Sequence, residues 1–145
     1  MKAGSDFPNL NAKVPDGRRA DGSNYKVMIV DDSIFVRKQL SQILSSEEYE
    51  VVGMAGDGEE AIEMYKVFYP SVDIVTMDIT MPKMDGITAL EKLIEFDKNA
   101  RIIMVSALGK QELVKKSLLM GAKNYIVKPL DRKKVLERIL AVVSK

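Results

Sequence analysis

The chain has 145 residues, enough for one domain with a hydrophobic core, and its 46% hydrophobic and 30% charged residues are typical of globular proteins. It contains no cysteine and no histidine, which excludes disulfides, thiolate catalysis, histidine-ligated zinc and a Ser-His-Asp triad. The net charge of +1 conceals two opposite halves: residues 25–100 hold 15 acidic against 7 basic residues, and residues 101–145 hold 11 basic against 3 acidic. An acidic half suits a cation, and a basic half suits an acidic partner surface.

The first residues have the composition of an unfolded segment. Residues 1–24 lack apolar periodicity and are rich in Gly, Asn, Asp and Arg, so we predict a disordered N-terminal tail over 1–24, its native origin left open, and a folded domain over 25–145. A DNA-binding arm is an alternative for "GRRADG", but two arginines without interleaved aromatic residues argue against nucleic-acid binding. Because no apolar run resembles a signal peptide or approaches the roughly 20 residues of a membrane span, we expect a cytoplasmic location without membrane insertion.

After this segment, apolar β-branched runs of strand length alternate with segments of helical period. We predict strands over 27–30, 51–55, 72–77, 102–105 and 124–127. An apolar stripe that starts at Val36 marks the first helix, and Ser33 and Asp131 are expected to cap the first and last helices. Five strands that alternate with five helices predict an α/β domain whose parallel sheet is covered on both faces.

The chemically active side chains follow the carboxyl ends of these strands. Asp31 and Asp32 follow the first strand, Asp78 the third, Ser106 the fourth and Lys128 the fifth. Ligands of such sheets bind at this edge, and a cluster of three carboxylates suits a hard divalent cation such as Mg²⁺. In the alternative interpretation, the aspartate pair only caps the first helix and Lys128 is an unrelated surface charge.

Four segments, "IVDDS", "VTMDITMPKMDG", "MVSA" and "YIVKP", resemble the signature blocks of the response-regulator receiver domain. The similarity extends from about Lys26 to the end of the chain. It implies a flavodoxin-like (CheY-like), doubly wound fold, in which five parallel strands have the order 2-1-3-4-5 and five helices cover the sheet. It also implies that the protein is not an enzyme beyond its own phosphorylation and dephosphorylation.

The resemblance assigns roles to the polar residues. It implies that Asp78 accepts a phosphoryl group from a histidine kinase, and that Asp31, Asp32, Asp78 and the backbone carbonyl of Thr80 hold Mg²⁺. Lys128 is then expected to pair with the phosphoryl oxygens.

The resemblance also implies a conformational switch. The Ser106 hydroxyl would bind the new phosphoryl group, the Tyr125 ring would then move inward, and Pro129 would follow a cis peptide bond. Without the resemblance, Tyr125 could equally be a strand residue that only packs. The family is variable two residues after Asp78 and two after Ser106, where this chain has Thr80 and Leu108, so its rate of self-dephosphorylation stays open. The basic residues of the expected partner face, together with Tyr125, are Lys110, Lys115, Lys116, Lys123, Arg132, Lys133 and Lys134.

The long blocks are most similar to the chemotaxis branch of the family. This similarity implies a CheA-like histidine kinase as phosphoryl donor, a FliM-like flagellar motor switch protein as target, a CheX- or CheZ-like phosphatase, and a monomeric state. Alternatives are a phosphorelay intermediate that passes phosphate to a histidine phosphotransfer protein, a Mg²⁺-dependent phosphatase, and a receiver-like scaffold that takes no phosphate.

Overall fold

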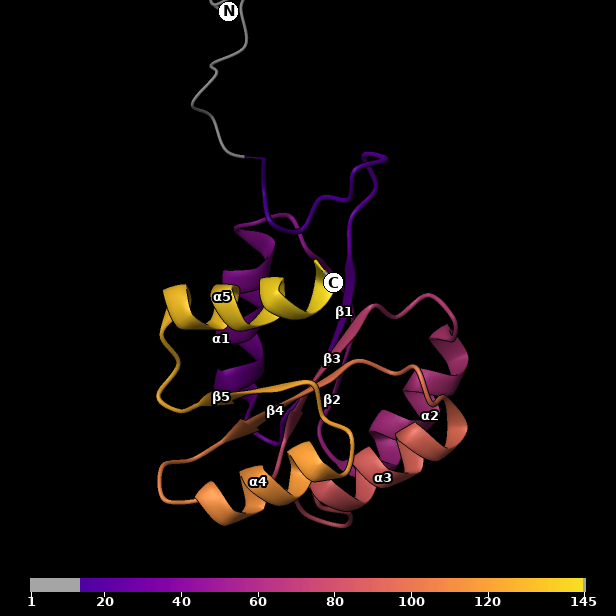
Figure 1. The fold of residues 1–145 in the computed structure, drawn as a ribbon, viewed down its shortest axis with the longest axis vertical. Coiled ribbons are helices and arrows are strands. Elements are labelled where there is room, and N and C mark those ends of the chain that lie inside the picture. Colours follow the sequence, from indigo (N-terminus) through magenta and orange to yellow (C-terminus); the bar gives the residue numbers. More distant parts are fainter. Residues whose placement is uncertain (1–13, 145) are drawn as a thin grey trace, which may run out of the picture.

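The computed structural model describes residues 14–144, which form a parallel sheet between two layers of helices (Figure 1). Strands and helices alternate along the chain, as the sequence predicts. The strands are β1 (Lys26–Val30), β2 (Glu50–Ala55), β3 (Ile74–Asp78), β4 (Ile102–Ser106) and β5 (Asn124–Val127). The helices are α1 (Ile34–Ser45), α2 (Gly58–Phe68), α3 (Gly86–Phe96), α4 (Gln111–Leu119) and α5 (Arg132–Val143).

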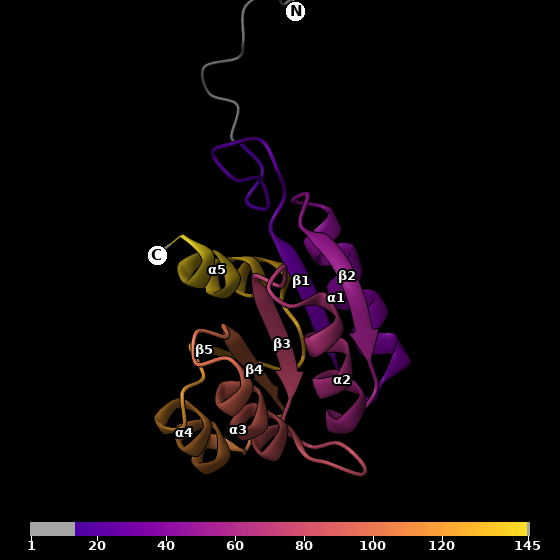
Figure 2. The same ribbon diagram turned by 90° about the vertical axis from the view of Figure 1, so that its right-hand side faces the viewer.

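The strand order is β2-β1-β3-β4-β5, and all neighbouring strands are parallel. The predicted fold is therefore confirmed. After β2 at one edge, the chain crosses over β1 to continue with β3, so the direction of winding reverses between β1 and β3 (Figure 2). This reversal places the carboxyl ends of β1 and β3 side by side, which is where ligands of doubly wound sheets bind.

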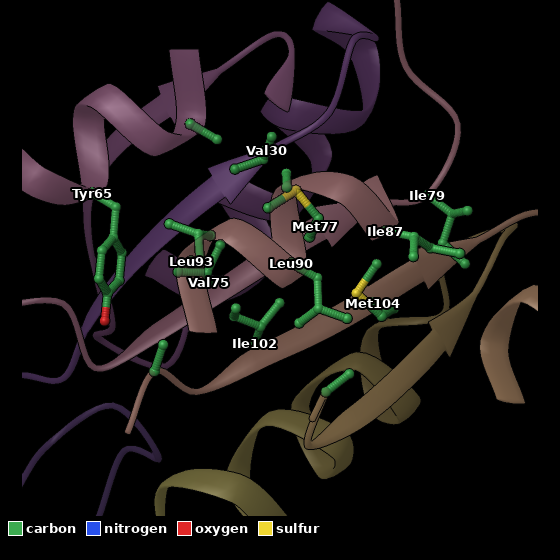
Figure 3. Close-up of a cluster of buried hydrophobic side chains, with 14 of the residues drawn as sticks. Val30, Tyr65, Val75, Met77, Ile79, Ile87, Leu90, Leu93, Ile102 and Met104 are labelled. Atoms are coloured by element: carbon green, nitrogen blue, oxygen red, sulfur yellow. The ribbon is translucent and has the colours of Figure 1, made fainter. Parts of the chain in front are cut away.

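Continuous apolar strands bury side chains on both faces of the sheet. In β1, Val27 and Ile29 pack in a cluster with residues of α1 and α5, whereas Met28 and Val30 pack in a second cluster with residues of α2, α3 and α4. Figure 3 shows part of this second cluster. The two clusters explain why the strand sequences do not alternate between apolar and polar residues.

Side chains cap the helices at the predicted positions. The Ser33 hydroxyl accepts a hydrogen bond from the Val36 amide at 3.2 Å, and the Asp131 carboxylate accepts one from the Lys134 amide at 3.4 Å. Both residues satisfy an amide that the first helical turn leaves without a backbone partner. Among residues 14–144, no helix is long and apolar enough to span a membrane.

Several strand boundaries differ from those predicted by one or two residues, and part of the predicted tail is ordered. The largest difference is in β3, which begins at Ile74 rather than at residue 72; the preceding Asp73 accepts a hydrogen bond from the Lys26 amide with its carboxylate. Residues 14–24, predicted as part of a disordered tail, form a turn that hydrogen-bonds to the connection between α1 and β2. The cause is long-range pairing, which local composition does not reveal. The rest of the predicted tail, residues 1–13, lies outside the described residues.

Candidate functional site

Three aspartates meet at the carboxyl edge of the sheet. Asp31 and Asp32 follow β1 and Asp78 is the last residue of β3, so the reversal of winding brings them together. One carboxylate oxygen of each lies within 4.8 Å of the others. Asp31 and Asp78 are buried, and Asp32 is exposed. This is the only group of its kind among residues 14–144 that could hold a metal ion.

Lys128, which follows β5, reaches the same cluster across β4. Its Nζ lies 3.1 Å from Asp31 Oδ2 and 3.5 Å from Asp78 Oδ1. The lysine side chain is 25% exposed, so water screens these two ion pairs only in part. The arrangement excludes the interpretation of Lys128 as an unrelated surface charge.

The cluster perturbs the titration of Asp78 and Lys128. Burial and the negative charge of Asp31 raise the pKa of Asp78 to about 7, although the charge of Lys128 acts in the opposite direction. Burial alone would lower the pKa of Lys128, but the Asp31 and Asp78 carboxylates beside its ammonium outweigh this effect and raise it. Asp78 is thus a carboxyl group whose ionised form needs additional positive charge nearby.

The donor set fits a hard divalent cation. Asp31 Oδ1 accepts a hydrogen bond from the Ser33 amide at 2.9 Å, but Asp31 Oδ2 is buried and receives no hydrogen bond of good geometry despite its proximity to Lys128. A buried carboxylate oxygen without a directed donor is available as a ligand. The exposed Asp32 leaves one side of the cluster open to water. Such a site matches Mg²⁺, which binds through one or two carboxylates and keeps several of its water ligands.

Two further residues build the site, and sequence reasoning did not assign them a role in it. Gly86 packs against the end of β3: its amide donates to the Ile79 carbonyl at 2.7 Å, and a Cβ at this position would lie 2.0 Å from the Asp78 carbonyl oxygen. Arg37 donates to the Asp31 carbonyl at 2.6 Å. The sequence signal for Gly86 was its place at the end of the block "VTMDITMPKMDG", and Arg37 gave none.

Other predicted site residues lie around the cluster. Ser106 is buried at the end of β4, where its hydroxyl donates to the Ala107 carbonyl at 3.3 Å. Thr80 is exposed, two residues after Asp78. The peptide bond between Lys128 and Pro129 is cis.

Tyr125 lies in β5 between two hollows. An apolar pocket of about 260 Å³ on the α4 side is lined by Ser106, Val114 and Tyr125, and a groove of about 580 Å³ on the α5 side is lined by Tyr125, Lys134 and Arg138. The Arg138 guanidinium carbon lies 4.6 Å from the centre of the Tyr125 ring. The half-buried tyrosine therefore has a cation on the α5 side and open space on the α4 side.

The predicted basic residues surround this strand, since α4 and α5 flank β5 at the edge of the sheet (Figure 1). Those that the structure exposes are Lys110, Lys115, Lys116, Lys123, Arg132, Lys133 and Lys134. Arg132 differs from the others because its guanidinium pairs with Glu47 Oε2 at 3.5 Å, beyond the end of α1.

Comparison with known proteins agrees with this geometry. The family model of the response regulator receiver domain matches residues 27–140. The chain is 64% identical over 144 residues to a chemotaxis protein CheY of Treponema pallidum, covering 99% of this chain and all of the relative. It is 49% identical over 115 residues to CheY of Bacillus subtilis, covering 79% of this chain and 94% of that protein.

A solved structure is similar over most of the chain. The crystal structure of a complex of CheX, CheY, BeF3 and Mg²⁺ from Borrelia burgdorferi contains a chain that matches with a TM-score of 0.89 and 58% identity, covering 92% of this chain and all of that one. These relatives are receiver proteins, so the alternative of a Mg²⁺-dependent phosphatase is set aside. The chain belongs to the response regulator receiver domain family and, within it, to the CheY-type chemotaxis proteins.

Proposed function

We propose that Asp78 accepts a phosphoryl group from a histidine kinase of the CheA kind. The observation that carries this proposal is the position of the Asp78 carboxylate, which lies between two further aspartates and the Lys128 ammonium. An ionised carboxylate oxygen of Asp78 attacks the phosphorus, the phosphorus–nitrogen bond of the donor breaks, and the leaving imidazole takes up a proton. The product is an acyl phosphate on Asp78.

Asp31, Asp32, Asp78 and the Thr80 carbonyl would hold Mg²⁺, which supplies positive charge at the transferring oxygens. The raised pKa of Asp78 gives a reason for this requirement, because a divalent cation favours the ionised form that attacks. Lys128 stabilises the remaining phosphoryl oxygen by its charge, since phosphoryl transfer depends mainly on positioning and electrostatics.

The response to phosphorylation involves Ser106 and Tyr125. The Ser106 hydroxyl makes only a long bond to the Ala107 carbonyl, so little is lost when it rotates to donate to a phosphoryl oxygen. Both residues line the apolar pocket beside α4, and this pocket can receive the tyrosine ring. The shape of the surface formed by α4, β5 and α5 then depends on the phosphorylation state.

The proposed partner of this surface is a FliM-like flagellar motor switch protein. The regulator would bind it as a monomer in the cytoplasm. The exposed lysines around β5 favour an acidic segment, and electrostatic attraction would speed association. A CheX-like phosphatase is a second proposed partner, supported by the solved complex of CheX with the Borrelia relative. A CheZ-like phosphatase is the alternative.

The test is incubation with acetyl phosphate, with and without Mg²⁺, followed by intact mass measurement. A Mg²⁺-dependent gain of one phosphoryl group is expected for the wild type and is lost in Asp78→Asn. Asp85→Asn, which changes an exposed aspartate in the connection that follows β3, is the matched control and should still gain the group. A wild type that stays unmodified, or an Asp78→Asn variant that is modified equally, would exclude the proposed chemistry.

A further inference from the structure

Residues 14–24 form an ordered turn that lies outside the region matched by the family model, which begins at residue 27. We call this segment the N-terminal clamp. Arg18 and Asn24 pair as an isolated antiparallel bridge, and the Arg19 amide donates to the Ser23 carbonyl at 2.7 Å. Asp21 accepts hydrogen bonds from both the amide and the hydroxyl of Ser23. The clamp therefore has its own local hydrogen bonds, as a folded turn requires.

Gly17 fits the clamp onto the connection between α1 and β2. Its amide donates to the Glu47 carbonyl at 2.7 Å, and its carbonyl accepts from the Tyr25 amide at 2.7 Å. A Cβ on Gly17 would lie 2.2 Å from the Tyr49 amide nitrogen, a distance that no side chain can adopt. The two backbones approach so closely that only glycine is compatible with docking.

Two arginines anchor the same segment by charge. Arg18 pairs with Glu48 at 2.6 Å. Arg19 pairs with Asp73 at 2.5 Å and stacks over the Tyr25 ring, with 4.6 Å between the guanidinium carbon and the ring centre. The anchors lie at the amino end of the sheet, so the clamp ties the connection after α1 to the start of β3.

Glu47 continues this set of contacts to α5. Its Oε1 accepts a hydrogen bond from the Asp16 amide at 2.9 Å, and its Oε2 lies 3.5 Å from the Arg132 guanidinium. The same guanidinium donates to the Ser46 hydroxyl at 2.9 Å. Arg132 is the first residue of α5 and comes four residues after Lys128. One carboxylate thus bridges the clamp and the first turn of the helix that follows the phosphoryl site.

We propose that the N-terminal clamp positions the first turn of α5 through the bridge from Glu47 to Arg132. The Asp16 amide of the clamp holds one oxygen of the Glu47 carboxylate, and the other oxygen holds Arg132. The importance of the clamp for partner binding rests on the proposed function, because α5 belongs to the proposed partner surface. The contacts of the bridge include no residue of the phosphoryl site.

Hydrogen exchange of the full-length chain tests this proposal at one amide. The Val135 amide donates to the Asp131 carbonyl at 2.9 Å in the first turn of α5, so its exchange reports opening of that turn. Gly17→Val should displace the clamp, and Glu47→Gln should remove the charge of the bridge without changing its size. Each is expected to speed exchange at Val135 roughly two- to fivefold, as the loss of a partly exposed ion pair implies. Ala20→Ser, an exposed change in the same segment, is the control.

The Arg132→Gln background separates positioning from general destabilisation. With Arg132 replaced, Gly17→Val should still speed exchange at the Tyr49 amide but should have no further effect at Val135. An unchanged rate at Val135 in both single variants, or an equal effect of Gly17→Val in the two backgrounds, would overturn the proposal. If Gly17→Val does not fold, the conservative Glu47→Gln variant decides alone. Failure of the acetyl phosphate reaction would refute the proposed function and leave this result unaffected.

Discussion

Asp78→Asn is expected to remove a pH dependence of folding that the wild-type protein shows when divalent cations are chelated. The pKa of Asp78 rises from 3.8 to about 7 in the folded protein because the carboxyl group is buried beside Asp31. A carboxyl group with a raised pKa holds its proton more tightly in the folded than in the unfolded state. The free energy of unfolding should therefore fall as the pH rises between these two pKa values, and should then stay constant.

The size of the effect follows from the two pKa values. Each pKa unit corresponds to about 1.4 kcal/mol, so the whole interval amounts to about 4 kcal/mol, of which about 3 kcal/mol is lost between about pH 5 and pH 8. The Asp78 side chain is only 7% exposed, so solvent screening reduces this value little. The asparagine variant has no charge to bury at any pH.

The assay is urea unfolding of wild type and Asp78→Asn in EDTA at several pH values from about 5 to 8. The stability of the variant relative to wild type should grow by about 3 kcal/mol over this range. Glu91→Gln, which removes an exposed carboxylate on α3, should keep the wild-type profile. Mg²⁺ at about 100 times its Kd should add about 2.7 kcal/mol to the wild type and less to Asp78→Asn. A constant difference between wild type and variant at all pH values would refute the reasoning.

Three further predictions concern the packing beside Asp78, the hydrophobic core and the Tyr125 ring. Gly86→Ala should lower the free energy of unfolding by about 1–3 kcal/mol, because the added Cβ would meet the carbonyl oxygen of Asp78 at the end of β3. The same substitution should slow phosphorylation by acetyl phosphate. Urea unfolding equal to that of the wild type would contradict the close packing. Leu90→Ala should lower the free energy of unfolding, measured in urea, by about 2–5 kcal/mol, because this side chain is fully buried between α3 and the sheet. Leu119→Ala is the control: the side chain is 90% exposed, so the loss should be well under about 1 kcal/mol. Arg138→Ala should shift the NMR signals of the Tyr125 ring in the unphosphorylated protein, and signals equal to wild type would show that the guanidinium does not hold the ring.

The architecture and the carboxylate cluster could be predicted because both follow from local patterns. Apolar runs such as 27–30 identify buried strands, and the rule that parallel strands end at one edge brings Asp31, Asp78 and Lys128 together. The order of the strands came from the resemblance to the receiver family. The resemblance also supplied the roles of Ser106 and Tyr125, which residue types alone leave open.

The N-terminal clamp could not be predicted, because nothing in residues 14–24 repeats with the period of a helix or strand. Its stability comes from partners far along the chain: Gly17 requires the backbone near Tyr49, and Arg19 requires Asp73. Composition describes what a segment can do alone, whereas docking depends on a surface that exists only after folding. The orientation of Arg132 toward Glu47 escaped prediction for the same reason.

The sharing of strands between the two hydrophobic clusters has a consequence for cooperativity. Ile29 in β1 and Ile103 in β4 belong to the cluster with α1 and α5, and their neighbours Met28 and Met104 belong to the other. Loss of either helix layer would expose one side of every central strand while the backbone between the strands stayed paired. Neither half of the molecule can then persist without the other, so unfolding should occur as one all-or-none transition, with equal midpoints by circular dichroism and by tyrosine fluorescence.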